Sequence, residues 1–98
     1  MLAAFSITPI GSGEDVGQQV AEAIRIIRES GLPNRTAASF TEIEGEWDEV
    51  FAVIKRATDA VMTVSSRCSI MIKADIRPGH TNTLNTKVET VERYLAQP

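Results

Sequence analysis

The stretch TEIEGEWDEVF, residues 41–51, changes from a β-strand pattern to a helical pattern within a few residues. We expect the helix to run from Trp47 or Asp48 to about Ser65, because apolar residues recur there at helical spacing. One stripe contains Val50, Val53, Ile54, Ala57, Val61 and Val64. Trp47, the only tryptophan, lies at the joint between acidic residues. Its indole either closes one end of the core or marks the rim of a site for a flat, cationic ligand.

Two longer segments on either side of this stretch have the alternating pattern of β-strands. The first is LAAFSITPI, residues 2–10, with Ala3, Phe5 and Ile7 on one face and Ala4, Ser6 and Thr8 on the other. The second is RCSIMIKADIR, residues 67–77. Its apolar face has Cys68, Ile70, Ile72, Ala74 and Ile76, and its polar face has Arg67, Ser69, Met71, Lys73 and Asp75.

The remaining segments complete the order βαββαβα. A helix is expected with Val16 to Ile27 on its apolar stripe and a stop at Gly31. Ser12 and Asp15 are spaced for a capping box at its start. The segment LPNRTAASFTEIEGE, residues 32–46, is long enough for two short strands joined by a tight turn. The last helix is predicted from a narrow stripe that contains Leu84, Val88, Val91 and Leu95.

This order predicts an α+β protein, a ferredoxin-like βαββαβ sandwich with an additional C-terminal helix, as a single domain over residues 1–98. Two connecting helices with one apolar stripe each should cover one face of a mainly antiparallel sheet. The other face then carries short hydroxyl side chains and isolated charges. Such a face suits a hydrogen-bonding concavity, a wet interface with another subunit, or plain exposure to solvent.

Composition excludes several classes of function. A net charge of −3 and scattered basic residues argue against nucleic acid as a partner. The single cysteine cannot form an internal disulfide, and no segment approaches the ~18–20 apolar residues of a membrane span. The apolar N-terminus lacks the basic residues of a signal peptide. We therefore expect a cytoplasmic protein.

Neither a catalytic centre nor a metal site is expected. His80, the only histidine, is interpreted as a turn residue, and Cys68 as a buried thiol; together they cannot supply the ligands of a zinc site. The run GSGED, residues 11–15, precedes a helix, but its two acidic residues would repel a phosphate. This also argues against acylphosphatase, which needs an arginine-bearing phosphate loop there. The open face lacks the aromatic residues with which RNA-recognition modules stack bases.

Five stretches carry a resemblance to a known family. They are SITPIGSGE (6–14), AEAIRIIRESGL (21–32), TEIEGEWDEVFAVIKRA (41–57), IKADIRPG (72–79) and KVETVERYL (87–95). With these stretches in this order, the chain resembles the small thiamine-binding, YkoF-like family. The most specific part of the resemblance is IEGEWDEV followed by IKADIRPG. The resemblance implies ferredoxin-like homo-oligomers, typically tetramers of sheet-joined dimers. It also implies binding of thiamine or its hydroxymethylpyrimidine half in vitamin salvage, transport or sensing, without catalysis or a cofactor.

The resemblance also implies a set of ligand-binding residues. They are Ser6, Thr8, Ser39, Thr41, Glu44, Trp47, Lys73 and Asp75. We expect the ligand on the open face of the sheet, where hydroxyls would meet the aminopyrimidine edge and acids would attract the thiazolium cation. The run NRTAAS, residues 34–39, differs from the family's Tyr-x-Val-x-Pro-Met-like run in the hairpin expected to line the pocket.

Two other functions stay open from the residues alone. One is a small-metabolite enzyme that uses Asp75, Glu44 or His80 as acid or base. The other is a structural or regulatory oligomerisation module.

Overall fold

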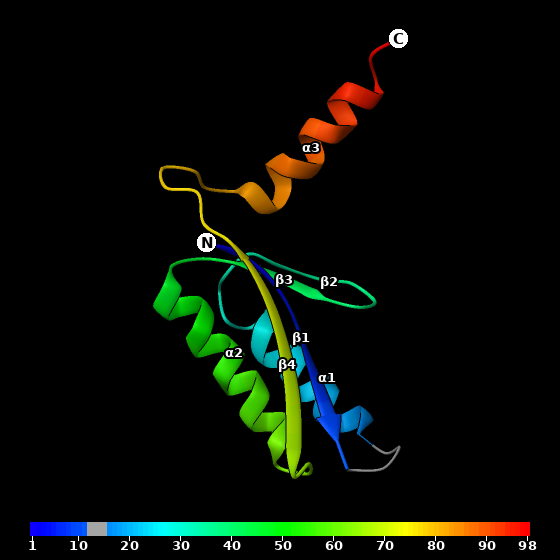
Figure 1. The fold of residues 1–98 in the computed structure, drawn as a ribbon, viewed down its shortest axis with the longest axis vertical. Coiled ribbons are helices and arrows are strands. Elements are labelled where there is room, and N and C mark those ends of the chain that lie inside the picture. Colours follow the sequence, from blue (N-terminus) through cyan, green and yellow to red (C-terminus); the bar gives the residue numbers. More distant parts are fainter. Residues whose placement is uncertain (12–15) are drawn as a thin grey trace.

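The protein, described by a computed structural model over residues 1–11 and 16–98, has the predicted order of elements (Figure 1). They are β1 (Leu2–Ile10), α1 (Gly17–Arg28), β2 (Asn34–Thr36), β3 (Thr41–Glu44), α2 (Trp47–Met62), β4 (Arg67–Asp75) and α3 (Thr83–Leu95). The expected capping pair Ser12 and Asp15 lies outside the described residues. The helix expected to reach Ser65 ends at Met62.

The four strands form one antiparallel sheet in the order β2-β3-β1-β4. Each helical connection therefore joins two parallel strands with an antiparallel strand between them. This is the ferredoxin-like arrangement, so the predicted fold class is confirmed. The two neighbours of β1 pair with it over different lengths: β4 pairs from Leu2 to Ile10, whereas β3 pairs only from Leu2 to Phe5.

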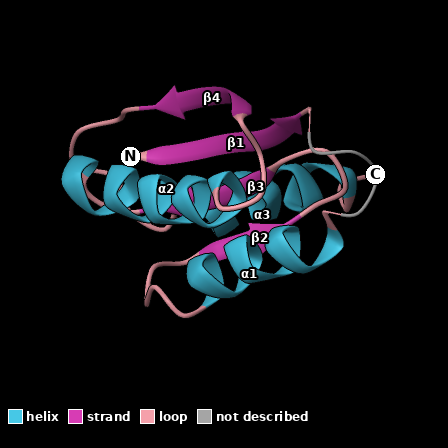
Figure 2. Ribbon diagram, turned by 90° about the horizontal axis from the view of Figure 1, so that it is seen from below, coloured by secondary structure: helices cyan, strands magenta, loops and turns pink. Residues whose placement is uncertain are grey.

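The helices α1 and α2 lie on one face of the sheet (Figure 2). They enclose a core that contains Ala3, Phe5, Ala23, Ile27, Ile43, Val50, Val53, Ile54, Ala57 and Val61. The strand residues in this core come from the predicted apolar face of β1 and from β3. The side chains of Ile70 and Ile72, on the same face of the edge strand β4, remain exposed because α2 covers this strand only in part.

The acidic residues around Trp47 begin α2. The Glu46 backbone amide donates to Glu49 Oε1 at 3.1 Å, which is one half of a capping box, and Asp48 adds a favourable negative charge in the first turn. Trp47 itself is 51% exposed and stacks on Phe51, with 5.6 Å between ring centroids. The interpretation of its indole as a plug at the end of the core is therefore wrong.

The third helix, α3, projects away from the rest of the molecule (Figure 1). The radius of gyration is accordingly 15.2 Å, compared with about 13 Å for a compact domain of this length. The chain enters α3 through Asn82, which has the left-handed φ of 59°. Along α3, Leu84 is buried, but Val88, Val91, Tyr94 and Leu95 are exposed.

Candidate functional site

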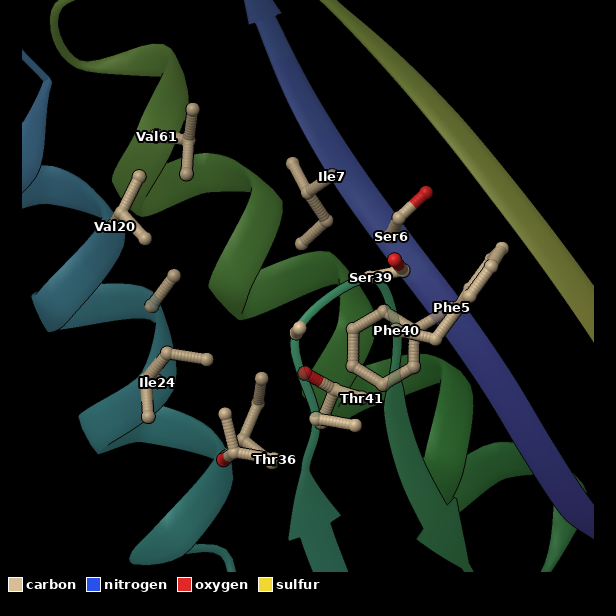
Figure 3. Close-up of a pocket in the computed structure, with 14 residues that line it drawn as sticks. Phe5, Ser6, Ile7, Val20, Ile24, Thr36, Ser39, Phe40, Thr41 and Val61 are labelled. Carbon is tan, nitrogen blue, oxygen red and sulfur yellow. The ribbon is translucent and has the colours of Figure 1, made fainter.

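A cavity of about 240 Å³ lies between α1, the unpaired half of β1 and the loop that joins β2 to β3. We call it the hairpin cavity (Figure 3). Its lining residues are Phe5, Ser6, Ile7, Val20, Ala23, Ile24, Ile27, Thr36, Ala37, Ala38, Ser39, Phe40, Thr41 and Val61. In Figure 3 the hairpin residues Phe40 and Thr41 lie on one side, and Val20 and Ile24 of α1 lie across from them.

The cavity exists because β3 is much shorter than β1. The last pair between these strands is Phe5 with Thr41, so residues 6–10 of β1 have no partner on that side among the described strands. The hairpin turns away there, closed by a 3.0 Å hydrogen bond from the Ala37 amide to the Phe40 carbonyl. Unpaired backbone groups of a strand edge are strong donors and acceptors, so this wall can bind a polar ring edge.

Hydroxyl groups supply the remaining polarity of the hairpin cavity. Thr41 is only 8% exposed, and its hydroxyl makes no hydrogen bond within the described residues. Ser39 lies in the loop above it, and the Thr36 hydroxyl accepts a 3.3 Å hydrogen bond from Arg28. Among the described residues, the other lining side chains are apolar and none of the lining side chains is ionisable. This environment favours a flat, uncharged ring over an ion.

The structure does not bring the eight expected ligand-binding residues together. Three of them line the hairpin cavity, namely Ser6, Ser39 and Thr41. The placement of Thr41 on the open face is wrong, because it pairs with Phe5 and so shares the helix-covered face. Ser6 is on the open face, and its hydroxyl points away from Ile24 in Figure 3, so it contributes mainly backbone to the cavity.

Four more of the expected residues, namely Thr8, Glu44, Lys73 and Asp75, lie on the open face, away from this cavity. Thr8 pairs with Ser69, and Lys73 pairs with Ala4, along β1 and β4. Asp75 forms an ion pair with Lys87 of α3, and this hydrogen bond and charge lower the pKa of the Asp75 carboxyl. Trp47 belongs to the helix side and lines none of the cavities described here. Thr41 and Trp47 therefore lie away from the open face, on which five of the eight expected residues are spread along β1, β3 and β4.

Glu44 has a structural partner that the sequence did not reveal. Its carboxylate accepts hydrogen bonds from the Thr83 amide (2.9 Å), the Thr83 hydroxyl (2.7 Å) and the Leu84 amide (3.1 Å). Burial would raise the pKa of Glu44, but these three hydrogen bonds and the nearby N-terminal amine lower it overall. Glu44 thus caps α3 from β3. It also lines a second cavity of about 310 Å³ beside Met1, Pro33 and His80, where its carboxylate is already occupied.

No constellation suited to catalysis is found in the described part of the chain. Cys68 is half-buried on the helix side of β4, and His80 lies in the exposed loop before α3. No group of three His, Cys, Asp or Glu side chains that could hold a metal occurs among residues 1–11 and 16–98. No helix within these residues is long and apolar enough to cross a membrane.

Sequence reasoning missed the apolar walls of the hairpin cavity, above all Phe40. This ring lies between Ser39 and Thr41 at the end of the hairpin, and it is 37% exposed. An aromatic residue next to two expected site residues was the available signal.

Comparisons with known proteins agree with this fold. Residues 3–92 match the family described as thiamine-binding protein. The UPF0045 protein Mb1933 of Mycobacterium bovis is 57% identical over 99 residues, which cover all of this chain and 97% of that protein. The crystal structure of the Methanocaldococcus jannaschii protein MJ1052 has a TM-score of 0.82 at 31% identity and covers 93% of this chain and 94% of its own.

A more distant structure shares the fold alone. It is a Thermotoga maritima protein to which a role in thiamine biosynthesis or salvage has been ascribed, with a TM-score of 0.73 at 20% identity over 95% of this chain and 96% of its own. The family match covers most of the chain, and the relatives match over nearly their full lengths. The chain therefore belongs to the thiamine-binding protein family.

Proposed function

We propose that the protein binds thiamine, or its hydroxymethylpyrimidine half, without catalysing a reaction, and that the pyrimidine ring occupies the hairpin cavity. Family membership supports a thiamine-related role. The observation that carries the choice of cavity is the lining that the described residues give it, which is uncharged and combines hydroxyls with the unpaired edge of β1. Such a protein would serve vitamin salvage, transport or sensing.

The two halves of thiamine suit different places: the pyrimidine suits the inside of the hairpin cavity, and the thiazolium suits its solvent side. An aminopyrimidine presents donors and acceptors along one edge, which match the β1 backbone and the hydroxyls of Ser39 and Thr41. Its faces are apolar and can pack between Phe40 and the α1 side chains. The thiazolium carries a permanent charge, and because no carboxylate of residues 1–11 and 16–98 lines the cavity, this half stays at the solvent side.

The size of the hairpin cavity also supports a pyrimidine ring inside and a thiazolium ring outside. Its 240 Å³ is below the ~300–1,000 Å³ typical of pockets that enclose a drug-sized ligand. One ring fits inside, and the second ring remains outside. Hydroxymethylpyrimidine should therefore retain most of the affinity of thiamine.

The proposal includes a homo-oligomer, in which two copies pair through the edge strand β4 and two such dimers associate. A nine-residue edge strand with exposed Ile70, Met71 and Ile72 is an association surface unless it is covered. In an antiparallel pair centred on Met71, Arg67 of each copy lies opposite Asp75 of the other. Opposite charges at both ends and apolar residues in the middle favour this register.

Isothermal titration calorimetry with thiamine and with hydroxymethylpyrimidine tests the ligand. Thr41→Val removes a hydroxyl from the cavity with little change of shape. Loss of one neutral hydrogen bond, worth about 1 kcal/mol net, should weaken binding about fivefold. Thr8→Val is the matched control, because it removes a hydroxyl from the open face of β1 and should leave the affinity unchanged.

Two results would refute the proposal. One is the absence of heat with either compound at millimolar concentration. The other is loss of binding in Thr8→Val with full retention in Thr41→Val, which would place the ligand on the open face of the sheet.

A further inference from the structure

A hollow of about 260 Å³ lies between the loop after β4 and the first turns of α3. We call it the α3 hollow. It is lined by Arg77, His80, Thr83, Thr86, Lys87 and Thr90. Every ionisable side chain in this lining is basic, although acidic residues outnumber basic ones in the whole chain by 13 to 10. The described lining of the α3 hollow therefore has the opposite sign of charge to the chain as a whole.

The α3 hollow has hydrogen-bond donors that are not used elsewhere. The Arg77 guanidinium, the His80 ring and the Thr86 hydroxyl form no hydrogen bond within the described residues. The other two hydroxyls are occupied as donors, since Thr83 donates to Glu44 Oε2 at 2.7 Å and Thr90 donates to the Thr86 carbonyl at 2.7 Å. The free donors therefore come from two different segments, the loop and one face of α3.

Nearby acidic groups do not cancel the positive charge of this region. Asp75 is ion-paired with Lys87, and the positive charges of Arg77 and Lys73 also lower the pKa of its carboxyl. One carboxylate therefore lies near three cations. Glu44 accepts its three hydrogen bonds from Thr83 and Leu84 and thereby occupies the N-terminus of α3. An anion in the hollow would bind to side chains and would not depend on the helix dipole.

We propose that the α3 hollow binds a phosphate group, either free or as a monoester. A planar guanidinium binds two oxygens of a phosphate in parallel, a lysine ammonium adds a point charge, and Thr86 and His80 can donate to the remaining oxygens. A carboxylate has only two oxygens for donors on two opposing segments, so the four-oxygen anion is the better match. The α3 hollow shares no residue with the hairpin cavity, and the proposal does not depend on the vitamin ligand.

Titration of inorganic phosphate, followed by backbone amide shifts in ¹⁵N-labelled full-length protein, tests this site. Saturable shifts are expected around Arg77, His80 and Thr86. Arg77→Gln should weaken the apparent affinity about tenfold or more, because it removes a charge-assisted hydrogen bond. Arg56→Gln, which removes an exposed arginine from α2, is the control and should leave the affinity unchanged.

A second titration with glycerol phosphate distinguishes the two sources of the anion. Tighter binding of the ester would identify a phosphorylated metabolite, and equal binding would identify free phosphate. The proposal is overturned if millimolar phosphate gives no saturable shifts at the α3 hollow. It is also overturned if Arg56→Gln weakens binding as much as Arg77→Gln, because the effect would then reflect net charge alone. The dispersion of the amide spectrum checks that both variants are folded.

Discussion

Replacing Glu44 by alanine should destabilise the protein by detaching α3. The change removes a charged acceptor from two backbone amides in the first turn of α3 and from the Thr83 hydroxyl. Hydrogen bonds to charged groups contribute about 1.5–3 kcal/mol each, and loss of an N-cap costs about 1 kcal/mol. Water can replace part of this at the half-exposed Thr83, so we expect a loss of about 2–4 kcal/mol in the free energy of unfolding.

Urea denaturation measures this loss, and amide hydrogen exchange at Thr83 and Leu84 shows whether it arises at α3. Glu42→Ala is the control: it removes a carboxylate from the same strand and the same face, but one without a hydrogen bond to another described residue. It should change stability by no more than about 0.5 kcal/mol. If Glu44→Ala also stays within that range, the capping role is refuted.

The pH dependence of the free energy of unfolding, measured for the wild type and for Glu44→Ala, gives an independent check of the capping role of Glu44. Because the pKa of Glu44 is lowered in the folded state, its ionised form stabilises the fold. This contribution is fully present above the unfolded-state pKa of about 4.3 and is lost as the pH falls through the lowered folded-state pKa. The stability difference between the wild type and Glu44→Ala should therefore be constant near neutral pH and shrink in acid. A difference that grows in acid would contradict the sign.

Two other substitutions test particular parts of the structure. Trp47→Ala should lower the free energy of unfolding by roughly 0.5–1.5 kcal/mol, because the stack on Phe51 is lost, and urea denaturation measures this change. The same substitution should leave the ligand affinity measured by calorimetry unchanged. A large loss of affinity would show that the indole belongs to the binding site. Met71→Lys would place two like charges opposite each other at the centre of the proposed β4 pair, and light scattering should then show a shift toward monomer. Thr63→Lys, at the exposed end of α2, should leave the assembly unchanged, and a Met71→Lys protein that assembles normally would exclude this pairing.

Much of the fold follows from local patterns in the sequence. Alternation in residues 2–10 assigns Phe5 to the covered face, and the structure confirms it as a core residue. The face of Thr41 was harder, because it depends on the register between the hairpin and β1. The loop 37–40 has no Asn-Gly or Asp-Gly to mark that register, and a slip of one residue moves every side chain to the opposite face.

The site depends on features that no local pattern contains. The hairpin cavity arises because β3 stops pairing with β1 at Phe5, which is a difference in strand length and not in residue type. The partner of Glu44 is 39 residues away along the chain, and the loop that leads into α3 turns through two residues with left-handed φ, Gly79 and Asn82. These are tertiary relations, so residue spacing alone could not reveal them.

The position of the pyrimidine ring is the most direct test of the proposed function. Intermolecular nuclear Overhauser effects between hydroxymethylpyrimidine and the labelled protein measure it. A ring in the hairpin cavity predicts contacts with Phe40, Thr41 and Ile24. Contacts with Thr8, Ser69 and Lys73 on the open face, without any to Phe40, would contradict it.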